Sequence, residues 1–310
     1  MKKTLVALAV SSVAVSSMSA FAADEATKFD TYGNIQLVYA DSDDDGSQIA
    51  DNGSTFGFQG STAISQDLTG FFKYELEADA DENDSDVSVG LDQAFVGLMG
   101  HFGTVKVGTF DGVYDDAIQD GLDQFEYLGI SGNGTTSEGD TIAYISPSFN
   151  GFEVQASAQV KGSADDSVTA TTPESENGTA ATLVVKYSVD ALTLTAGYDN
   201  RETTIGSVEP TMGLAASYQV SPAWSVGAKF EDTKDEATRF GLTTRYSYGM
   251  GDLYGAYQTV ESDVANTADY DEYGVGATYN LASNIYVYAE YGQQGSTEDQ
   301  VMATGATYLF

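Results

Sequence analysis

Cysteine is absent from this chain of 310 residues, and histidine occurs only once, as His101. Without cysteine there is no disulfide, no thiolate metal site and no cysteine nucleophile. A serine-hydrolase triad would need the histidine beside a serine and an acid, whereas His101 falls in a two-residue turn between two strand-like segments. We therefore expect no catalytic residue, no cofactor and no bound metal.

Long apolar runs are also lacking beyond the first residues, which excludes a helical membrane anchor. Lys2 and Lys3 precede an apolar run over 5–15, and Ala20-Phe21-Ala22 supplies the small residues of a cleavage site. Only four Pro occur, and no linker-like composition interrupts the chain. We expect residues 1–22 to be a signal peptide and residues 23–310 to form a single domain.

Basic residues are scarce, with 12 Lys and Arg against 47 Asp and Glu. Removal of the signal peptide takes Lys2 and Lys3 but no acid, which leaves 10 basic residues against 47 acidic ones and a net charge of −37. Nucleic acid is excluded as a partner, because binding it requires Lys and Arg to neutralise phosphates.

Most of the chain alternates between apolar and polar residues. From about residue 28 onward, apolar side chains alternate with small or polar ones, most cleanly over 192–198 and 224–231, and this period of two is typical of strands whose faces meet different environments. We expect sixteen strands, over residues 28–40, 54–65, 68–78, 91–100, 103–109, 141–146, 152–160, 180–188, 192–199, 212–220, 224–231, 238–248, 252–260, 272–280, 285–291 and 299–310.

The connections alternate between short turns and long loops, the latter near 41–53, 79–90, 110–140, 161–179, 200–210 and 261–271. Strict alternation puts all turns at one end and all loops at the other, as in outer-membrane barrels. Strands of about ten residues, rising about 3.3 Å each and tilted about 45°, cover about 23 Å, close to the apolar band of such barrels. The predicted fold class is all-β, a sixteen-stranded antiparallel transmembrane β-barrel.

A soluble β-sandwich is the alternative fold. Its outer faces would carry Lys, Glu and Thr in water, whereas the polar faces here are mostly Gly, Ser, Thr and Gln. Aromatic residues near the segment ends fit an interfacial girdle instead; they include Tyr187, Tyr198, Tyr218, Phe230, Tyr246, Tyr279 and Tyr291.

Several stretches resemble the general-diffusion porins of Gram-negative outer membranes, and those of γ-proteobacteria in particular. They are Tyr32-Gly33, residues 71–77, 94–108 and 144–152, and the final Tyr308-Leu309-Phe310. The resemblance implies an outer-membrane barrel, usually trimeric, whose third long loop folds into the lumen and faces a ladder of basic wall residues. Where that family commonly has Arg, this chain has Asp92-Gln93 and Thr109. It therefore has fewer basic residues on the wall that faces the third loop.

The loop over 110–140 is the candidate pore constriction. Its acidic residues are Asp111, Asp115, Asp116, Asp120, Asp123 and Glu126. Inside a narrow water-filled channel these carboxylates would focus a negative potential and enrich cations; on the outer surface they would be solvated charge. The surviving candidates for the basic pore wall are Lys73, Lys106 and Lys28.

The segment Asp41-Ser42-Asp43-Asp44-Asp45-Gly46 matches the opening of a calcium loop. Position twelve is Asn52 rather than Glu, and strands flank the loop instead of helices, so an EF-hand is excluded and any divalent site would be weak.

We interpret the chain as a passive, water-filled outer-membrane channel for small hydrophilic solutes and ions, selective for cations, and a homotrimer in contact with lipid and lipopolysaccharide. Two alternatives stay open. A sugar-selective channel would show aromatic residues on the lumen side. The alternation of their strand places Tyr286 and Tyr288 on that side. A non-conducting adhesin or receptor barrel would bind partners through its long loops.

Overall fold

The computed structural model describes residues 27–81, 89–136, 138–160, 179–201 and 209–310. The predicted signal peptide lies outside this part of the chain. The strands are β1 (Thr27–Ser42), β2 (Gly46–Asp51), β3 (Thr55–Ser65), β4 (Leu68–Ala78), β5 (Val89–Gly100), β6 (Gly103–Thr109), β7 (Thr141–Ile145), β8 (Phe152–Val160), β9 (Thr179–Val189), β10 (Leu192–Asp199), β11 (Thr211–Ser221), β12 (Trp224–Thr233), β13 (Ala237–Ser247), β14 (Asp252–Ser262), β15 (Tyr270–Ala282), β16 (Ile285–Gln294) and β17 (Asp299–Leu309).

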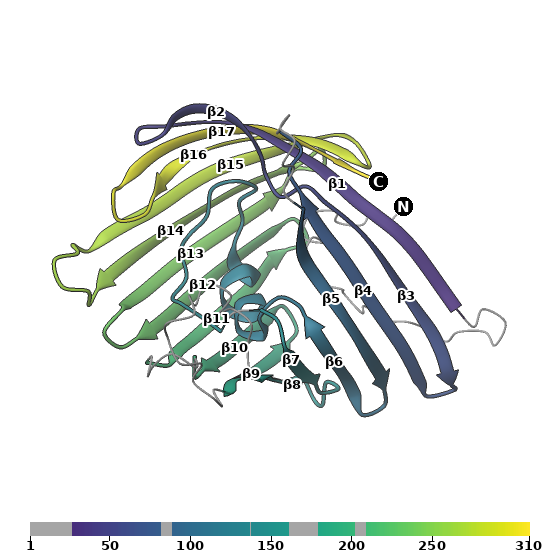
Figure 1. Ribbon diagram of the computed structural model, residues 1–310. Coiled ribbons are helices and arrows are strands. Elements are labelled where there is room, and N and C mark those ends of the chain that lie inside the picture. Colours follow the sequence, from purple (N-terminus) through teal and green to yellow (C-terminus); the bar gives the residue numbers. More distant parts are fainter. Residues whose placement is uncertain (1–26, 82–88, 137, 161–178, 202–208) are drawn as a thin grey trace, which may run out of the picture.

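The sheet closes because β17 pairs with β1, from Leu309 opposite Asn34 to Val301 opposite Ser42. On its other side β1 pairs with β3 through its first half and with β2 through its second half. β2 and β3 therefore occupy the same position in the sheet, next to β1, and together count as one strand of the barrel. The strands form a closed antiparallel barrel of sixteen strands (Figure 1). Closure leaves no edge strand in need of a partner, which lipid does not supply.

The expectation of a loop over 41–53 is wrong in part, because residues 46–51 fold back on β1 as β2. The chain then turns into β3 at Asp51. The Asp51 carboxylate accepts hydrogen bonds from the backbone N–H groups of Gly53, at 2.9 Å, and Ser54, at 2.8 Å. These bonds satisfy the backbone groups that leave the ladder at the break between the two strands.

Alternation gives the barrel two different faces. On β11, Met212 and Leu214 point outward and are 51% and 58% exposed, whereas Ala215 faces inward and is buried. Six of the seven expected girdle aromatics are at least 40% exposed, and the seventh, Tyr187, packs against Phe152 with ring centres 4.4 Å apart. No helix among the described residues is long and apolar enough to cross a membrane.

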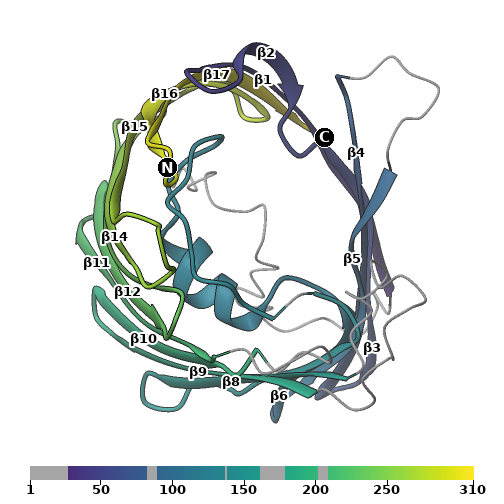
Figure 2. The same ribbon diagram turned by 60° about the vertical axis from the view of Figure 1, so that its left-hand side comes forward.

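The segment between β6 and β7 lies inside the barrel instead of outside it (Figure 2). It contains a short π-helix, η1 (Asp115–Gln119), and a 3-10 turn, η2 (Asp120–Leu122). η1 contacts the inner faces of β10 and β11, and η2 contacts that of β12. Phe110, Tyr114 and Ile118 are each no more than 2% exposed, so the apolar side of this lumen loop, residues 110–140, is buried against the wall.

Glycines on the inner wall make room for the lumen loop. A Cβ atom at Gly213 would lie 2.2 Å from the Tyr114 hydroxyl, and one at Gly227 would lie 2.5 Å from the Leu122 side chain. At Gly274 a Cβ would lie 2.7 Å from the Phe125 ring. Since real Cβ contacts are not this short, any larger residue at these positions displaces the loop or the wall.

We expect Gly213→Val to loosen the lumen loop, because overpacking costs about 1–3 kcal/mol. Hydrogen exchange at the amides of residues 126–128 should accelerate. Gly90→Ala is the control, because nothing lies within 4 Å of a Cβ there. Equal protection in the Gly213 variant and the parent would show that the glycine is not needed for the loop to dock.

Candidate constriction of the lumen

Asp111, Asp116 and Asp120 gather on the side of the lumen loop that faces away from the wall-packed side chains. Asp120 is exposed, and the other two are half-buried. Asp111 accepts a hydrogen bond from the Gln93 amide at 2.8 Å. Lys106 on β6 faces this group, with its Nζ 3.9 Å from the centre of the Phe110 ring. The structure thus brings three of the six predicted acids together with one of the three predicted bases.

These carboxylates are harder to ionise than free aspartates. Burial raises the pKa of Asp116 to about 7; the negative charge of Asp111 adds to this rise, and Lys106 opposes it. Burial likewise raises the pKa of Asp111, against the lowering effect of Lys73 and Lys106. Crowded, partly desolvated carboxylates of this kind bind protons near neutral pH, so the charge of the group varies with pH.

The other three predicted acids point elsewhere. Asp115 turns toward the returning arm of the loop, where the Thr135 hydroxyl donates to it at 3.1 Å. Asp123 accepts the backbone N–H of Phe125 at 3.0 Å and so shapes the loop itself. Glu126 accepts from the hydroxyl of Tyr286 on β16 at 2.7 Å. These hydrogen bonds tie the three carboxylates to other parts of the lumen loop or to the wall.

The other two predicted bases, Lys73 and Lys28, have different surroundings. Lys73 on β4 is 7% exposed, and its Nζ lies 2.7 Å from the carboxylate of Glu75 on the same strand. Lys28 lies near the start of β1, opposite Ser61 of β3, at the turn end of the barrel. His101 lies in the β5–β6 turn, exposed, with Nδ1 3.4 Å from Asp67.

The sequence interpretation missed Glu138, an acid on the returning arm of the lumen loop. Burial raises the pKa of Glu138, and repulsion from Asp111 and Asp120 adds to the effect, so it shares their space. Its position, sixteen residues beyond the end of the helical part at Leu122, carried no signal, because only the fold brings the two arms of the loop together.

The wall anchors the loop through carboxylates that accept backbone hydrogen bonds. Glu290 on β16 accepts three successive N–H groups, from Glu126 at 2.7 Å, Tyr127 at 3.0 Å and Leu128 at 2.9 Å. The Tyr254 hydroxyl donates to the same carboxylate at 2.7 Å. Hydrogen bonds to a charged acceptor contribute about 1.5–3 kcal/mol each, so Glu290 is a main anchor of the loop tip.

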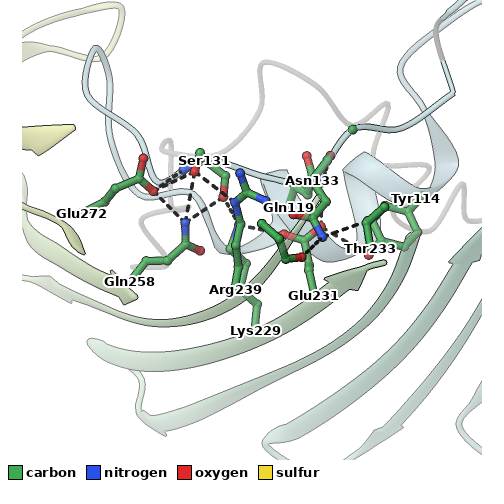
Figure 3. Close-up of polar contacts among 12 residues, drawn as sticks. Tyr114, Gln119, Ser131, Asn133, Lys229, Glu231, Thr233, Arg239, Gln258 and Glu272 are labelled. Carbon is green, nitrogen blue, oxygen red and sulfur yellow. Dashed lines mark hydrogen bonds and ion pairs between the residues drawn. The ribbon is translucent and has the colours of Figure 1, made fainter. Parts of the chain in front are cut away.

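Ser131 is a second anchor point, surrounded by four wall residues (Figure 3). Its N–H and hydroxyl donate to Glu272 at 2.9 and 2.8 Å. Its carbonyl accepts from the Lys229 ammonium at 2.8 Å and the Gln258 amide at 2.9 Å, and its hydroxyl accepts from Arg239 at 3.2 Å. Every polar group of this serine is satisfied by the wall.

A buried ion pair on β12 completes the anchor. Lys229 and Glu231 have fully buried side chains, with Nζ 3.1 Å from the carboxylate. The same carboxylate accepts from the Tyr114 hydroxyl at 3.2 Å and the Gln119 amide at 2.7 Å. Lys229 and Glu231 are two residues apart on one strand, so their side chains point to the same face. This spacing is the sequence signal from which the pair could have been predicted.

The lumen loop carries Asp111, Asp116 and Asp120 on the side away from its wall-packed residues. Within the described part of the chain, no group of three or more His, Cys, Asp or Glu is placed to hold a metal ion. What the geometry provides is a fixed loop with carboxylates on its free side.

The family model for Gram-negative porins matches residues 5–299. The chain belongs to the Gram-negative porin family. Similar proteins include "Monosaccharide porin" of a Halomonas species and "Major outer membrane protein" of Halomonas elongata, each 33% identical and covering 100% of both chains. "Outer membrane porin PhoE" of Enterobacter cloacae is 25% identical over 100% of both.

Solved porin structures share the fold. The Salmonella typhi OmpF complex with daunomycin superposes with a TM-score of 0.75 at 21% identity, covering 92% of this chain and 98% of that one. A mutant of the Rh. blastica porin gives a TM-score of 0.73 at 18% identity, covering 91% and 100%. The predicted family, barrel fold and outer-membrane location are confirmed.

We expect the ion preference of this porin to depend on pH. With the pKa of Asp116 at about 7, lowering the pH from 8 to 6 protonates this carboxylate and removes negative charge from the passage. Cation preference should therefore fall across this interval, measured as reversal potential under a KCl gradient. An Asp116→Asn variant should show a flatter profile; an equally steep one would assign the titration to other groups.

Proposed function

We propose that this porin is a passive, water-filled channel for small hydrophilic solutes and ions, with a preference for cations and no catalytic step. The observation that carries the proposal is the lumen loop, which presents Asp111, Asp116 and Asp120 to the open passage. In a narrow channel with low-dielectric walls, unpaired carboxylates lower the energy of a passing cation and raise that of an anion.

The opposite wall supports the same preference. Lys73 is paired with Glu75, and amide or hydroxyl side chains stand where related porins commonly carry arginine, at Gln93 and Thr109. Lys73 and Lys106 act on Asp111, and Lys106 and Lys186 act on Asp116. The fixed charges that face the passage are therefore mainly negative.

A sugar-selective channel is the second candidate, favoured by the name of the monosaccharide porin at 33% identity. The aromatic pair expected for it gives little support. Tyr286 and Tyr288 both face inward, but Tyr288 is only 3% exposed and its hydroxyl lies 3.2 Å from the Asn52 amide, which covers it. A buried ring offers no face on which a sugar can stack.

We expect the combined Asp111→Asn, Asp116→Asn and Asp120→Asn variant to lose most of its cation preference. Each carboxylate stabilises a nearby cation by about 1 kcal/mol even in bulk water, which corresponds to about fivefold in the permeability ratio. The measurement is the reversal potential in planar bilayers at low salt, where screening is weakest.

The matched control neutralises three exposed acids at the loop end: Asp235→Asn, Asp263→Asn and Glu298→Gln. It should keep the parental reversal potential. If both triple variants shift the potential equally, general surface charge determines selectivity rather than the lumen loop. Silent bilayers would instead favour the non-conducting adhesin or receptor.

We also propose a homotrimer, as in related porins. Four aromatic rings form a connected group on the outer face of β1, β3 and β4: Phe29, Phe58, Phe72 and Tyr74. The Phe58 and Tyr74 rings stack with centres 5.4 Å apart, and those of Phe29 and Phe58 lie 6.1 Å apart. A rigid aromatic patch of this kind suits a protein contact within the apolar band.

We expect Phe29→Ala with Phe58→Ala to convert trimers to monomers in mild detergent, as measured by light scattering. Phe240→Ala is the control, because Phe240 is also outward and 45% exposed but lies on β13. Dissociation in both variants, or in neither, would count against this patch as the interface.

A further inference from the structure

A polar cavity of about 360 Å³ lies at the loop end of the barrel, beside the tip of the lumen loop. Its volume falls at the lower end of the range of about 300–1,000 Å³ for small-molecule sites. Its polar lining comes from Ser42, Asp45, Gln48, Tyr127, Gln294 and Asp299, and its apolar floor from Ala40 and Val301. None of the charged residues at the candidate constriction lines this cavity.

Hydrogen bonds between separate elements fix the walls of this cavity. The β1–β2 hairpin is tied to β17, because the Asp44 N–H donates to Asp299 at 3.1 Å. Within the hairpin, the Asp45 N–H donates to the Ser42 hydroxyl oxygen at 2.9 Å. On the opposite side the Gln294 amide donates to the carbonyl of Gly129 in the lumen loop at 3.3 Å. The site is therefore preformed.

The lining has the chemistry of a polyhydroxylated ligand. Carboxylates accept hydrogen bonds from hydroxyl groups, and primary amides both donate and accept, so Asp45, Gln48 and Gln294 can each serve a sugar hydroxyl. The Tyr127 ring offers an apolar face beside them for C–H groups. A metal ion would require a denser set of acids, and no such group exists among the described residues.

We propose that this cavity is a docking site for a neutral monosaccharide-sized solute before it passes the constriction. The inference rests on the proposed channel function and adds a solute class to it. Tyr127 links the cavity to the lumen loop, because its side chain lines the cavity while its N–H is held by Glu290, which also holds the N–H groups of Glu126 and Leu128. A docked sugar would sit directly at the entrance of the passage and obstruct ion flow.

The test is glucose-dependent current in planar bilayers. With the parent porin, glucose added on the loop side should reduce KCl conductance along a saturating curve. In a variant with Asp45→Ala and Gln48→Ala the half-saturating concentration should rise about tenfold, because a lost hydrogen bond to a charged group is worth about 1.5–3 kcal/mol. Conductance without glucose should be unchanged.

Asp43→Ala is the matched control, since Asp43 lies in the same hairpin but does not line the cavity. A response to glucose that is linear and equal in all three proteins reflects viscosity alone and overturns the site. Block by Ca²⁺ with no saturating block by glucose overturns it as well, in favour of a cation site. Absence of any conductance contradicts the channel function instead, so the two failures are distinguishable.

Discussion

The position of the lumen loop depends on hydrogen bonds between its backbone and carboxylates of the barrel wall. A loop inside a barrel leaves the sheet ladder, so its N–H and C=O groups need other partners. Glu290 and Glu272 supply acceptors near the tip, and Asp199 accepts the N–H of Thr136 at 2.9 Å on the returning arm. Charged acceptors make these bonds strong as well as directional.

Packing and hydrogen bonding reinforce each other at this loop. The inner glycines of β10, β11 and β12 leave a slot of one side-chain depth, and Tyr114 fills part of it while its hydroxyl reaches Glu231. One residue thus contributes both apolar burial and a polar contact. The loop is thereby held against the inner faces of these strands.

The anchoring has an electrostatic consequence. Lys229, Arg239 and Arg245 are inward-facing bases, but each donates to the lumen loop, through Ser131 or the carbonyl of Gln124. Their charges are covered by the loop and do not face the open lumen. Asp111 and Asp116 are instead opposed by other bases, namely Lys73, Lys106 and Lys186.

The sixteen-stranded barrel could be predicted from the sequence, because a period of two and the alternation of turns and loops are local properties of the chain. The family was predicted from the resemblance of stretches such as residues 94–108 to known porins. The sequence also placed acids at residues 111–126. Only the tertiary structure decided which of them face the passage: Asp115 and Asp116 are neighbours, yet one turns to Thr135 and the other to Lys106. That choice, like the cavity at Tyr127, is set by contacts between residues far apart in the chain, which no local pattern encodes.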